Sequence, residues 1–241
     1  MGDKVLVAMS GGIDSSVAAW MLLNEGYNVA GVTMHFGALT EGDGKRSCTS
    51  AAIDDAKKVC ACLNISHYVF DYASRLENEV ITDFISEYQK GRTPNPCVRC
   101  NRHLKFGSLL DKAQELGFNY LATGHYAAIE KNEGVYCLTR PKDKKKDQTY
   151  FLYAIPYERL KNILFPLAQL TKDEVRNLAM KNSLPVTAKQ ESQDICFVTQ
   201  KNSQTFLLER VKDIAPGPIV DVRGNVLGRH RGIIFHTIGQ R

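Results

Sequence analysis

The sequence predicts an α/β fold with a doubly wound, mostly parallel sheet, followed by the start of a truncated β-rich domain. Up to Thr123, apolar runs of strand length alternate four times with stretches of helical periodicity. That order is typical of a parallel sheet with helices on both faces. A glycine-rich turn, Ser10–Gly12, follows the first run directly, and only strand and turn signals appear from Pro216 onward.

The elements follow from hydrophobic periodicity and from glycine stops. Continuous apolar runs predict four buried strands, over 4–9, 28–34, 67–71 and 120–123. Apolar residues at helical spacing predict four helices, over 14–24, 50–63, 76–90 and 106–116. The stretch RTPNPCVRCN, between the last two helices, is rich in proline and we interpret it as a loop.

After Thr123 the alternation stops. The segment 127–139 predicts a hairpin that turns at Asn-Glu-Gly. Thr171 with Glu174 three residues later forms a capping box, which predicts the start of a helix. The strand-and-turn stretch after Pro216 is too short to bury a core alone. We therefore expect one domain over 1–200, then a linker and the beginning of a β-rich domain over 201–241, with its C-terminal barrel absent.

Composition indicates an ordinary globular protein of a reducing compartment. With 44% hydrophobic and 24% charged residues, the 241-residue chain can bury a core. No apolar run reaches the roughly 20 residues that cross a bilayer, so we expect no membrane association. A net charge of +5 does not by itself indicate a polyanionic partner. Seven cysteines, without an export signal, predict a cytoplasmic protein.

Three polar segments are expected to meet at one edge of the sheet. Ser10–Gly12, Met34 and Thr123–His125 each lie at the carboxyl end of a predicted strand, where open α/β sheets bind ligands. A strand, a glycine-rich turn and a helix aim backbone N–H groups at one point, which favours an anion, most often phosphate. The hydroxyl groups of Ser10, Ser15 and Ser16 add donors.

The turn matches neither of two common phosphate motifs. It lacks the Gly-Lys-Ser/Thr of the Walker loop and the Gly-x-Gly-x-x-Gly of dinucleotide-binding folds. A purely structural turn is the alternative. We expect Asp14 to lie in a polar loop, so that Asp14→Ala should leave the fold intact.

Two cysteine segments carry candidate chemistry. Cys97 and Cys100 form Cys-x-x-Cys near Arg99 and Arg102, and such cations favour thiolate over thiol. Cys196 has polar residues before it and apolar residues after it, as at the mouth of a pocket. Half of a zinc site is an alternative for the pair, although no second pair has zinc-ligand spacing. A thioredoxin-like dithiol needs a strand-to-helix turn, and a lone Cys196 is often a buried filler.

The remaining cysteines lack such context. Cys60 and Cys62 fall on one predicted helix, where positions i and i+2 face different directions and do not share a metal. Cys48 and Cys137 stand apart from any motif. Lys142 and Lys144–Lys146 form a basic loop, which beside an anion site favours phosphate contact over simple solvation.

The string SGGIDSS resembles the PP-motif of the ATP pyrophosphatases, which split ATP between the α and β phosphates. The resemblance implies an adenine nucleotide α-hydrolase-like fold, a loop that holds pyrophosphate, and an Asp14 that helps to place Mg²⁺. Within that superfamily the sequence resembles the tRNA-specific 2-thiouridylases over essentially its whole length. The motifs that carry this resemblance, in the family's order, are GRTPNPCVRCN, ATGHYA, KDQTYFL, ESQDICFV and TIGQR.

The resemblance implies roles for individual residues. The ATP-contacting positions are Ala8, Met9, Ser10, Gly11, Gly12, Ile13, Asp14, Ser15, Met34 and Gly124. The positions that meet the target base or the tRNA are Asn95, Pro96, Cys97, His125, Lys146, Asp147 and Gln148. Cys100 matches the catalytic cysteine and Cys196 the cysteine that bears a persulfide.

The family activity is the formation of 2-thiouridine at the wobble position of tRNA. ATP adenylates the C2 carbonyl oxygen, and sulfur comes from a donor protein through the Cys196 persulfide. Many members have Asp where this chain has Cys97, which leaves a third thiol in the site. An alternative mechanism therefore has Cys97, Cys100 and Cys196 hold three irons of a [4Fe–4S] cluster. A non-catalytic nucleotide-binding or RNA-binding module is the alternative from another class.

Overall fold

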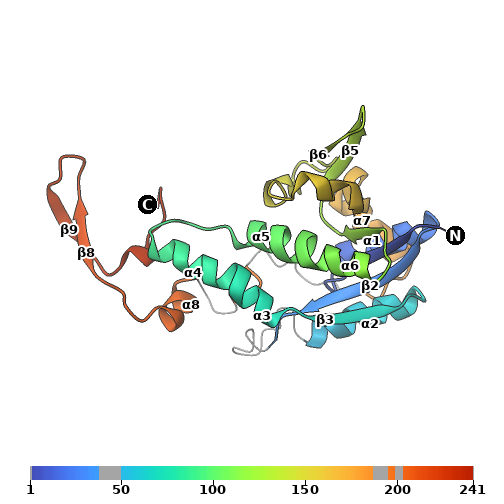
Figure 1. Ribbon diagram of the computed structural model, residues 1–241, viewed down its shortest axis with the longest axis horizontal. Coiled ribbons are helices and arrows are strands. Elements are labelled where there is room, and N and C mark those ends of the chain that lie inside the picture. The colour runs from blue at the N-terminus through green and yellow to red at the C-terminus, as the bar shows by residue number, and fades with distance from the viewer. Residues whose placement is uncertain (1, 38–49, 187–194, 199–202, 241) are drawn as a thin grey trace.

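A five-stranded parallel sheet has the strand order β3-β2-β1-β4-β7. It lies toward the end of the molecule that holds the N-terminus (Figure 1). This computed structural model describes residues 2–37, 50–186, 195–198 and 203–240. The strands are β1 (Lys4–Ala8), β2 (Asn28–His35), β3 (His67–Asp71), β4 (Tyr120–Thr123) and β7 (Ile163–Leu164). The first four confirm the predicted strands to within one residue. The sequence did not predict β7, which is only two residues long.

Helices cover both faces of the sheet, as predicted. Alternate residues of β1 face two different cores, since Leu6 packs on one side and Val5 and Val7 on the other. On the Val5 side lie the helices α1 (Ile13–Asn24) and α2 (Ser50–Cys62), both close to their predicted bounds. Each fully buried side chain of this kind contributes about 1.5–3 kcal/mol to folding.

Two long helices pack on the Leu6 face and extend past the sheet (Figure 1). The first comprises α3 (Ala73–Leu76), a π-helical turn over Glu77–Ile81 and α4 (Thr82–Gln89). The second comprises α5 (Pro96–Arg99), a π-helical stretch over Cys100–Leu109 that is kinked at Gly107, and α6 (Leu110–Glu115). Leu104 and Phe106 of the second helix are fully buried against the sheet.

The predicted start of this second helix at residue 106 was wrong. It begins at Pro96, because the Asn95 side chain accepts hydrogen bonds from the backbone N–H groups of Cys97 (3.1 Å) and Val98 (3.3 Å). Proline suits the first helical position, where no N–H partner is needed. The Cys-x-x-Cys pair therefore lies on a helix and not in a loop.

The chain after β4 adds smaller elements. The predicted hairpin is confirmed as β5 (Ala128–Asn132) and β6 (Val135–Thr139). The capping box of Thr171 and Glu174 is also confirmed, and it opens α7 (Lys172–Lys181). Among the described residues, no helix combines the length and the apolar character that crossing a membrane requires.

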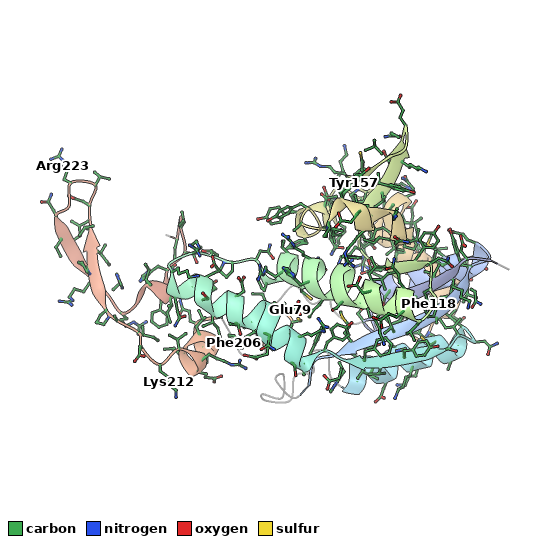
Figure 2. The ribbon with its side chains drawn as sticks, viewed as in Figure 1. Glu79, Phe118, Tyr157, Phe206, Lys212 and Arg223 are labelled. Atoms are coloured by element: carbon green, nitrogen blue, oxygen red, sulfur yellow. The ribbon has the colours of Figure 1, made fainter. Side chains whose placement is uncertain are left out.

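The C-terminal segment carries α8 (Ser203–Arg210) and the hairpin of β8 (Gly217–Val220) and β9 (Val226–His230). Phe206 of α8 and Ile234 join the same core as the long helices. The hairpin projects from the far end of those helices, with Arg223 at its tip (Figure 2).

Gly124 allows β4 and the start of α1 to approach each other. A Cβ atom at this position would lie 2.6 Å from the backbone carbon of Asp14 and 2.6 Å from the nitrogen of Ser15. Gly124→Ala should therefore lower the free energy of unfolding by about 1–3 kcal/mol, since neither backbone can move aside cheaply. Urea unfolding measures the effect.

Gly228→Ala is the matched control, because nothing lies within 4 Å of a Cβ built there. We expect that variant to unfold within about 0.5 kcal/mol of the parent. Equal stability of the two variants would contradict the close approach at Gly124.

Candidate active site

The loop between β1 and α1 has the geometry of an anion cradle. Gly11 has a φ of +71°, and a Cβ there would lie 2.6 Å from the carbonyl oxygen of Ala52. Gly12 is the N-cap residue of α1 and no side chain caps the helix there. The first-turn N–H groups of α1 therefore point out of the carboxyl edge of the sheet, where an anion can receive them.

Only one of the three predicted serine donors faces solvent. Ser15 and Ser16 are buried, and both hydroxyl groups donate to the carbonyl oxygen of Gly12, at 3.1 and 2.9 Å. In this structure these hydroxyls hold the turn together, and their contact with an anion stays a prediction. Ser10 is exposed, and its Oγ lies 3.4 Å from the N–H of Gly12.

The strand ends lie around this loop as predicted. Met9 donates to the carbonyl oxygen of Val32 (2.7 Å), which fixes the end of β1 beside β2. Ala8 ends β1 and Met34 lies near the end of β2. Gly124 follows β4 and packs on Asp14 and Ser15. Ile13, Asp14 and Gly12 are all partly exposed, so a ligand can reach the loop.

A buried lysine lies at the loop, and the sequence analysis missed it. Both side-chain oxygens of Asp14 accept from the ammonium group of Lys172, each at 2.7 Å. The Tyr126 hydroxyl donates to one of the same oxygens at 2.9 Å. The Lys172 side chain is only 6% exposed, whereas Asp14 is 31% exposed. The two residues are distant in sequence, and only the capping box at Thr171 marked the start of this helix.

Asp14 also does not lie in a loop, since it belongs to the first turn of α1. The placement of Asp14 in a loop, from which the tolerance of Asp14→Ala was predicted, was therefore wrong. That change would leave a buried ammonium group without its carboxylate, and a charge stranded in this way is costly.

The Cys-x-x-Cys pair lies in the first two turns of the second long helix. Cys97 is exposed, and Cys100 is partly buried against the main core. Their spacing of three places both on one face of the helix. The next residue, Asn101, is buried and donates from its side chain to the carbonyl oxygen of Phe151 (2.9 Å). This bond ties the cysteine helix to the segment around 148–152.

Cys196 lies beside this pair. Its neighbour Phe197 is buried and makes edge-on contact with the Phe84 ring, with centroids 5.4 Å apart. The apolar side of the ESQDICFV motif thus packs into the core next to Cys196, and residues 191–194 of that motif lie outside the described residues. The charges of Cys97, Cys100 and Cys196 influence one another, so the three thiols share one site.

The prediction that nearby cations favour thiolate was wrong for the free protein. Burial, together with the smaller effects of the Cys196 and Cys97 charges, raises the pKa of Cys100 to about 12. Desolvation of the Cys97 thiol by the protein around it also raises its pKa, although the residue is partly exposed to solvent. Lys105 opposes both increases, but its charge does not overcome desolvation. Cys97, Cys100 and Cys196 are all free thiols.

Lys105 also connects the thiols to the end of β4. It lowers the pKa of His125, whose burial between protein groups already holds that pKa well below its ordinary value. The His125 ring packs against the rings of Phe106 and Phe165, which also contact each other, and its Nδ1 is 2.6 Å from the Thr123 hydroxyl. His125 is therefore a neutral, fixed side chain at the crevice.

The segment 146–148 connects to the same structure. The backbone N–H of Gln148 donates to the carbonyl oxygen of Tyr126, and its side-chain oxygen accepts from the N–H of Tyr126, both at 2.9 Å. Asp147 accepts from the backbone N–H of Thr149 (2.9 Å) and pairs with Arg140 (3.5 Å). In the basic loop, Lys142 pairs with Glu174 at 2.8 Å and Lys144 is exposed.

The described residues contain no group of three or more His, Cys, Asp or Glu arranged to bind a metal ion. The three thiols are thus neighbours without having the arrangement of cluster ligands. Cys60 is buried with a pKa raised to about 11, while Cys62 and Cys137 are exposed. The prediction that Cys60 and Cys62 face different directions is confirmed, and Cys48 lies outside the described residues.

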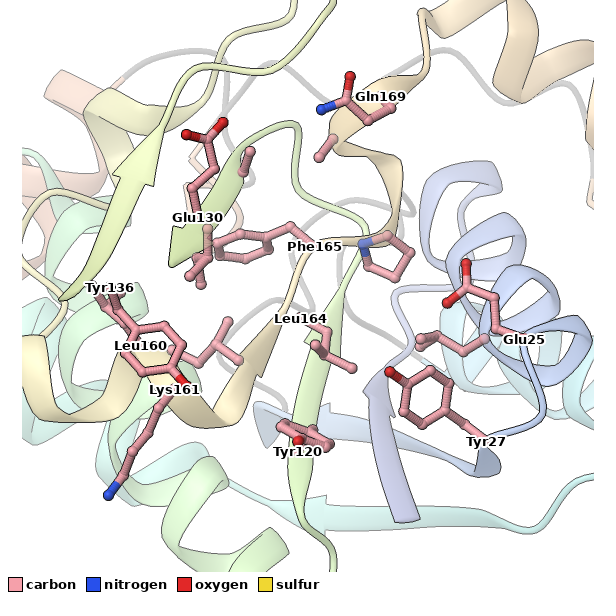
Figure 3. A pocket seen from close by; sticks show the side chains of 16 residues that line it. Glu25, Tyr27, Tyr120, Glu130, Tyr136, Leu160, Lys161, Leu164, Phe165 and Gln169 are labelled. Atoms are coloured by element: carbon pink, nitrogen blue, oxygen red, sulfur yellow. The ribbon is translucent and has the colours of Figure 1, made fainter. Parts of the chain in front are cut away.

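A cavity of about 380 Å³ lies elsewhere, beside the β5–β6 hairpin (Figure 3). Tyr27 and Tyr120, which stand near the amino ends of β2 and β4, line one side of it, and Glu130 and Tyr136 line another. It opens at the end of the sheet opposite to the glycine-rich loop and contains none of the predicted site residues. We therefore place the chemistry at the carboxyl edge and not in this cavity.

Comparisons with known proteins agree with this placement. A family model described as the tRNA methyl transferase HUP domain matches residues 3–200, and one described as the tRNA methyl transferase PRC-barrel domain matches residues 204–241. A tRNA-specific 2-thiouridylase of Syntrophus aciditrophicus is 58% identical, over 99% of this chain and 64% of that protein. One of Pelotomaculum thermopropionicum is 48% identical, over 99% of this chain and 67% of that protein. The chain thus spans about two thirds of the length of these relatives.

Solved structures share the fold at low sequence identity. A 4-thiouridine synthetase–RNA complex with bound ATP superimposes with a TM-score of 0.55 at 18% identity, over 86% of this chain and 50% of that chain. A glutamine-dependent NAD⁺ synthetase of Acinetobacter baumannii gives a TM-score of 0.51 at 15% identity, over 88% of this chain and 38% of that chain. The predicted α/β fold of the PP-loop type is therefore confirmed.

The Asp14–Lys172 ion pair predicts how substitutions of its two residues change the free energy of unfolding. Asp14→Ala should lower the free energy of unfolding by about 3 kcal/mol, because the Lys172 ammonium loses its carboxylate in a place that water does not reach. Lys172→Met should cost about 1 kcal/mol, since the partly exposed Asp14 can be hydrated. Urea unfolding of both variants and of the double variant measures the coupling. Additive losses in the double variant would show that the pair is not coupled.

The raised thiol pKa values predict slow alkylation. At neutral pH, iodoacetamide should modify Cys97 and the exposed Cys62 well before Cys100, because the thiolate is the reactive form. The Cys100 rate should rise about tenfold per pH unit up to the highest pH at which the fold survives. Lys105→Met should slow modification of both site cysteines and leave Cys62 unchanged. Peptide mass spectrometry separates the three rates, and equal rates for Cys62 and Cys100 at neutral pH would contradict the desolvation of Cys100.

Proposed function

Because the chain belongs to the tRNA-specific 2-thiouridylase family, we propose that it converts the wobble uridine of tRNA to 2-thiouridine at the cost of ATP. The observation that carries this proposal is the link between the glycine-rich loop and the thiols. Gly124 packs on the first turn of α1, His125 follows it, and the charge of Lys105 acts on both His125 and the site cysteines. This link supports a phosphate site and a sulfur site in one crevice.

The first half of the reaction is activation of the base. The C2 carbonyl of uracil is a poor electrophile without a leaving group, and adenylation of its oxygen supplies AMP as that group. The first-turn N–H groups of α1 and the Lys172 ammonium stabilise charge on the departing pyrophosphate. The proposed ATP contacts are Ala8, Met9, Ser10, Gly11, Gly12, Ile13, Asp14, Ser15, Met34 and Gly124.

Asp14 retains room for a Mg²⁺ ion that arrives with ATP. An ionised carboxylate has about four acceptor positions. Lys172 and Tyr126 donate three hydrogen bonds to Asp14, so one position remains on its partly exposed side. The ion supplies additional positive charge to the phosphates when it is bound.

The second half is sulfur transfer. The terminal sulfur of a Cys196 persulfide, received from a donor protein, attacks C2 and displaces AMP. The Cys100 thiolate then attacks the Cys196 sulfur, which releases the thiolated base and leaves a Cys100–Cys196 disulfide. A cytosolic dithiol reduces that disulfide by exchange. A variant of this step releases the persulfide sulfur as sulfide before it attacks C2.

The same proposal assigns the tRNA contacts. Asn95, Pro96 and Cys97 meet the target base, and His125 with Lys146, Asp147 and Gln148 contacts the tRNA. We also propose that residues 1–200 form the catalytic domain and that 201–241 are a linker and the beginning of a β-rich domain. An iron–sulfur cluster does not fit the arrangement of the described thiols, and no step of the proposal uses one.

The test separates activation from sulfur transfer. Purified protein with unmodified tRNA should release AMP and pyrophosphate from ATP. Cys100→Ser and Cys196→Ser should each abolish 2-thiouridine, measured by nucleoside mass spectrometry, and keep ATP–pyrophosphate exchange within about threefold. Cys97→Asp should keep most activity, because relatives carry Asp there.

Three outcomes would contradict the proposal. Release of ADP and phosphate would remove the assignment to the pyrophosphatases, and no ATP–pyrophosphate exchange with tRNA would favour a non-catalytic binding module. Thiolation with sulfide that depends on bound iron and is lost in Cys97→Ala would favour the cluster mechanism.

A further inference from the structure

Two neighbouring tyrosine rings beside the thiol site face solvent. Tyr150 and Tyr153 are 66% and 68% exposed, and their ring centroids are 6.2 Å apart. The partly buried Phe151 ring makes edge-on contact with Tyr150, with centroids 5.7 Å apart. Single exposed aromatic residues are common, but an adjacent pair supported by a third ring marks a contact surface. We call Tyr150 and Tyr153 the tyrosine platform.

Short hydrogen bonds fix the tyrosine platform relative to the thiols. Between the two tyrosines, the carbonyl oxygen of Phe151 accepts from Asn101, the residue that follows Cys100. Leu152 is buried in the main core, and Gln148 is bonded twice to Tyr126. The platform is therefore held at a set place next to Cys100, and does not move with a free loop.

Positive charge precedes the platform in the sequence, and one of these cations is linked to the platform segment through Asp147. The segment 140–146 contains five basic residues and one acidic residue, Asp143. Arg140 pairs with Asp147, and Asp147 in turn accepts from the backbone and the hydroxyl of Thr149, next to Tyr150. Aromatic faces beside cationic side chains are the combination that binds single-stranded nucleic acid, with bases stacked on the rings and cations near the backbone.

We propose that the tyrosine platform stacks an unpaired nucleobase of the substrate RNA, one that adjoins the base brought to Cys100. The proposal rests on the proposed function, because it takes RNA to be the substrate. It assigns Tyr150 and Tyr153 to positioning: they hold the loop of the RNA open beside the thiols, and they neither activate the base nor carry sulfur. Stacking needs a flat aromatic face and not the hydroxyl group, so phenylalanine should replace tyrosine.

The experiment uses the full chain and two RNA probes: an anticodon stem-loop with uridine at the wobble position, and a fully paired duplex of equal length. Tyr150→Ala and Tyr153→Ala should each weaken stem-loop binding by about tenfold, as expected for the loss of one base–aromatic stack. Duplex binding, which depends on phosphate contacts, should change less than about twofold. Tyr150→Phe and Tyr153→Phe should bind the stem-loop like the parent.

Tyr157→Ala is the matched control. Tyr157 is also 56% exposed, but its hydroxyl oxygen accepts from the backbone N–H of Tyr136, on the side of the β5–β6 hairpin (Figure 2). Its stem-loop affinity should equal that of the parent. 2-Aminopurine is placed in turn at each position of the RNA loop. The parent protein should quench its fluorescence at a position next to the wobble base. This quenching should disappear in Tyr150→Ala and Tyr153→Ala.

Several outcomes would overturn the proposal. These are equal losses for stem-loop and duplex, a loss in the phenylalanine variants as large as in the alanine variants, or a loss in Tyr157→Ala. If the alanine variants bind RNA like the parent, and lose thiolation only in assays that contain the sulfur-donor protein, the surface binds a protein and not RNA. Failure of the proposed function gives a different result. If the unmutated protein stacks the loop base but forms no 2-thiouridine, the tyrosine platform is supported and the proposed activity is contradicted.

Discussion

The ion pair between Asp14 and Lys172 is the contact on which the site depends. It joins the first turn of α1 to the first residue of α7, and the Tyr126 hydroxyl donates a third hydrogen bond to the carboxylate. Burying a lysine is expensive, and a well-packed apolar pair is often as stable as a buried ion pair. Stability alone therefore does not explain the pair. The position of the pair at the anion cradle explains it better. The pair holds the Lys172 ammonium group, desolvated and oriented, at the place where we propose that phosphate binds.

From Tyr126 the same contacts lead to the sulfur site. Tyr126 holds Gln148 by two hydrogen bonds, and the segment after Gln148 is held by Asn101 on the cysteine helix. A second route runs through the glycine that follows β4, because its missing side chain lets α1 approach. Both routes are short and made of buried or hydrogen-bonded groups. The distance between the glycine-rich loop and the cysteine helix is therefore set by the fold.

The sequence predicted those features that depend on neighbours along the chain. The four long strands, α1, α2, the β5–β6 hairpin and the Thr171 capping box follow from periodicity, glycine stops and local hydrogen bonds. The start of the cysteine helix at Pro96 was missed, although Asn-Pro is a local signal, because two prolines favoured a loop. Lys172 was missed because its partner is distant in sequence, and β7 because two residues have no periodicity. The thiol pKa values depend on burial, which no local pattern reveals.

The raised thiol pKa values limit what the three cysteines can do together. The charges of Cys196 and Cys97 raise the pKa of Cys100, and the charge of Lys105 opposes the rise at both Cys97 and Cys100. One lysine can compensate for about one thiolate, so two or three thiolates at once would require further positive charge. Sequential transfer through one persulfide needs a single anionic sulfur at each step. The raised pKa of Cys100 means that its thiol is protonated at neutral pH in the free protein. This agrees with the proposed transfer of one sulfur atom at a time, in which a partner or substrate changes the surroundings of Cys100 before it reacts.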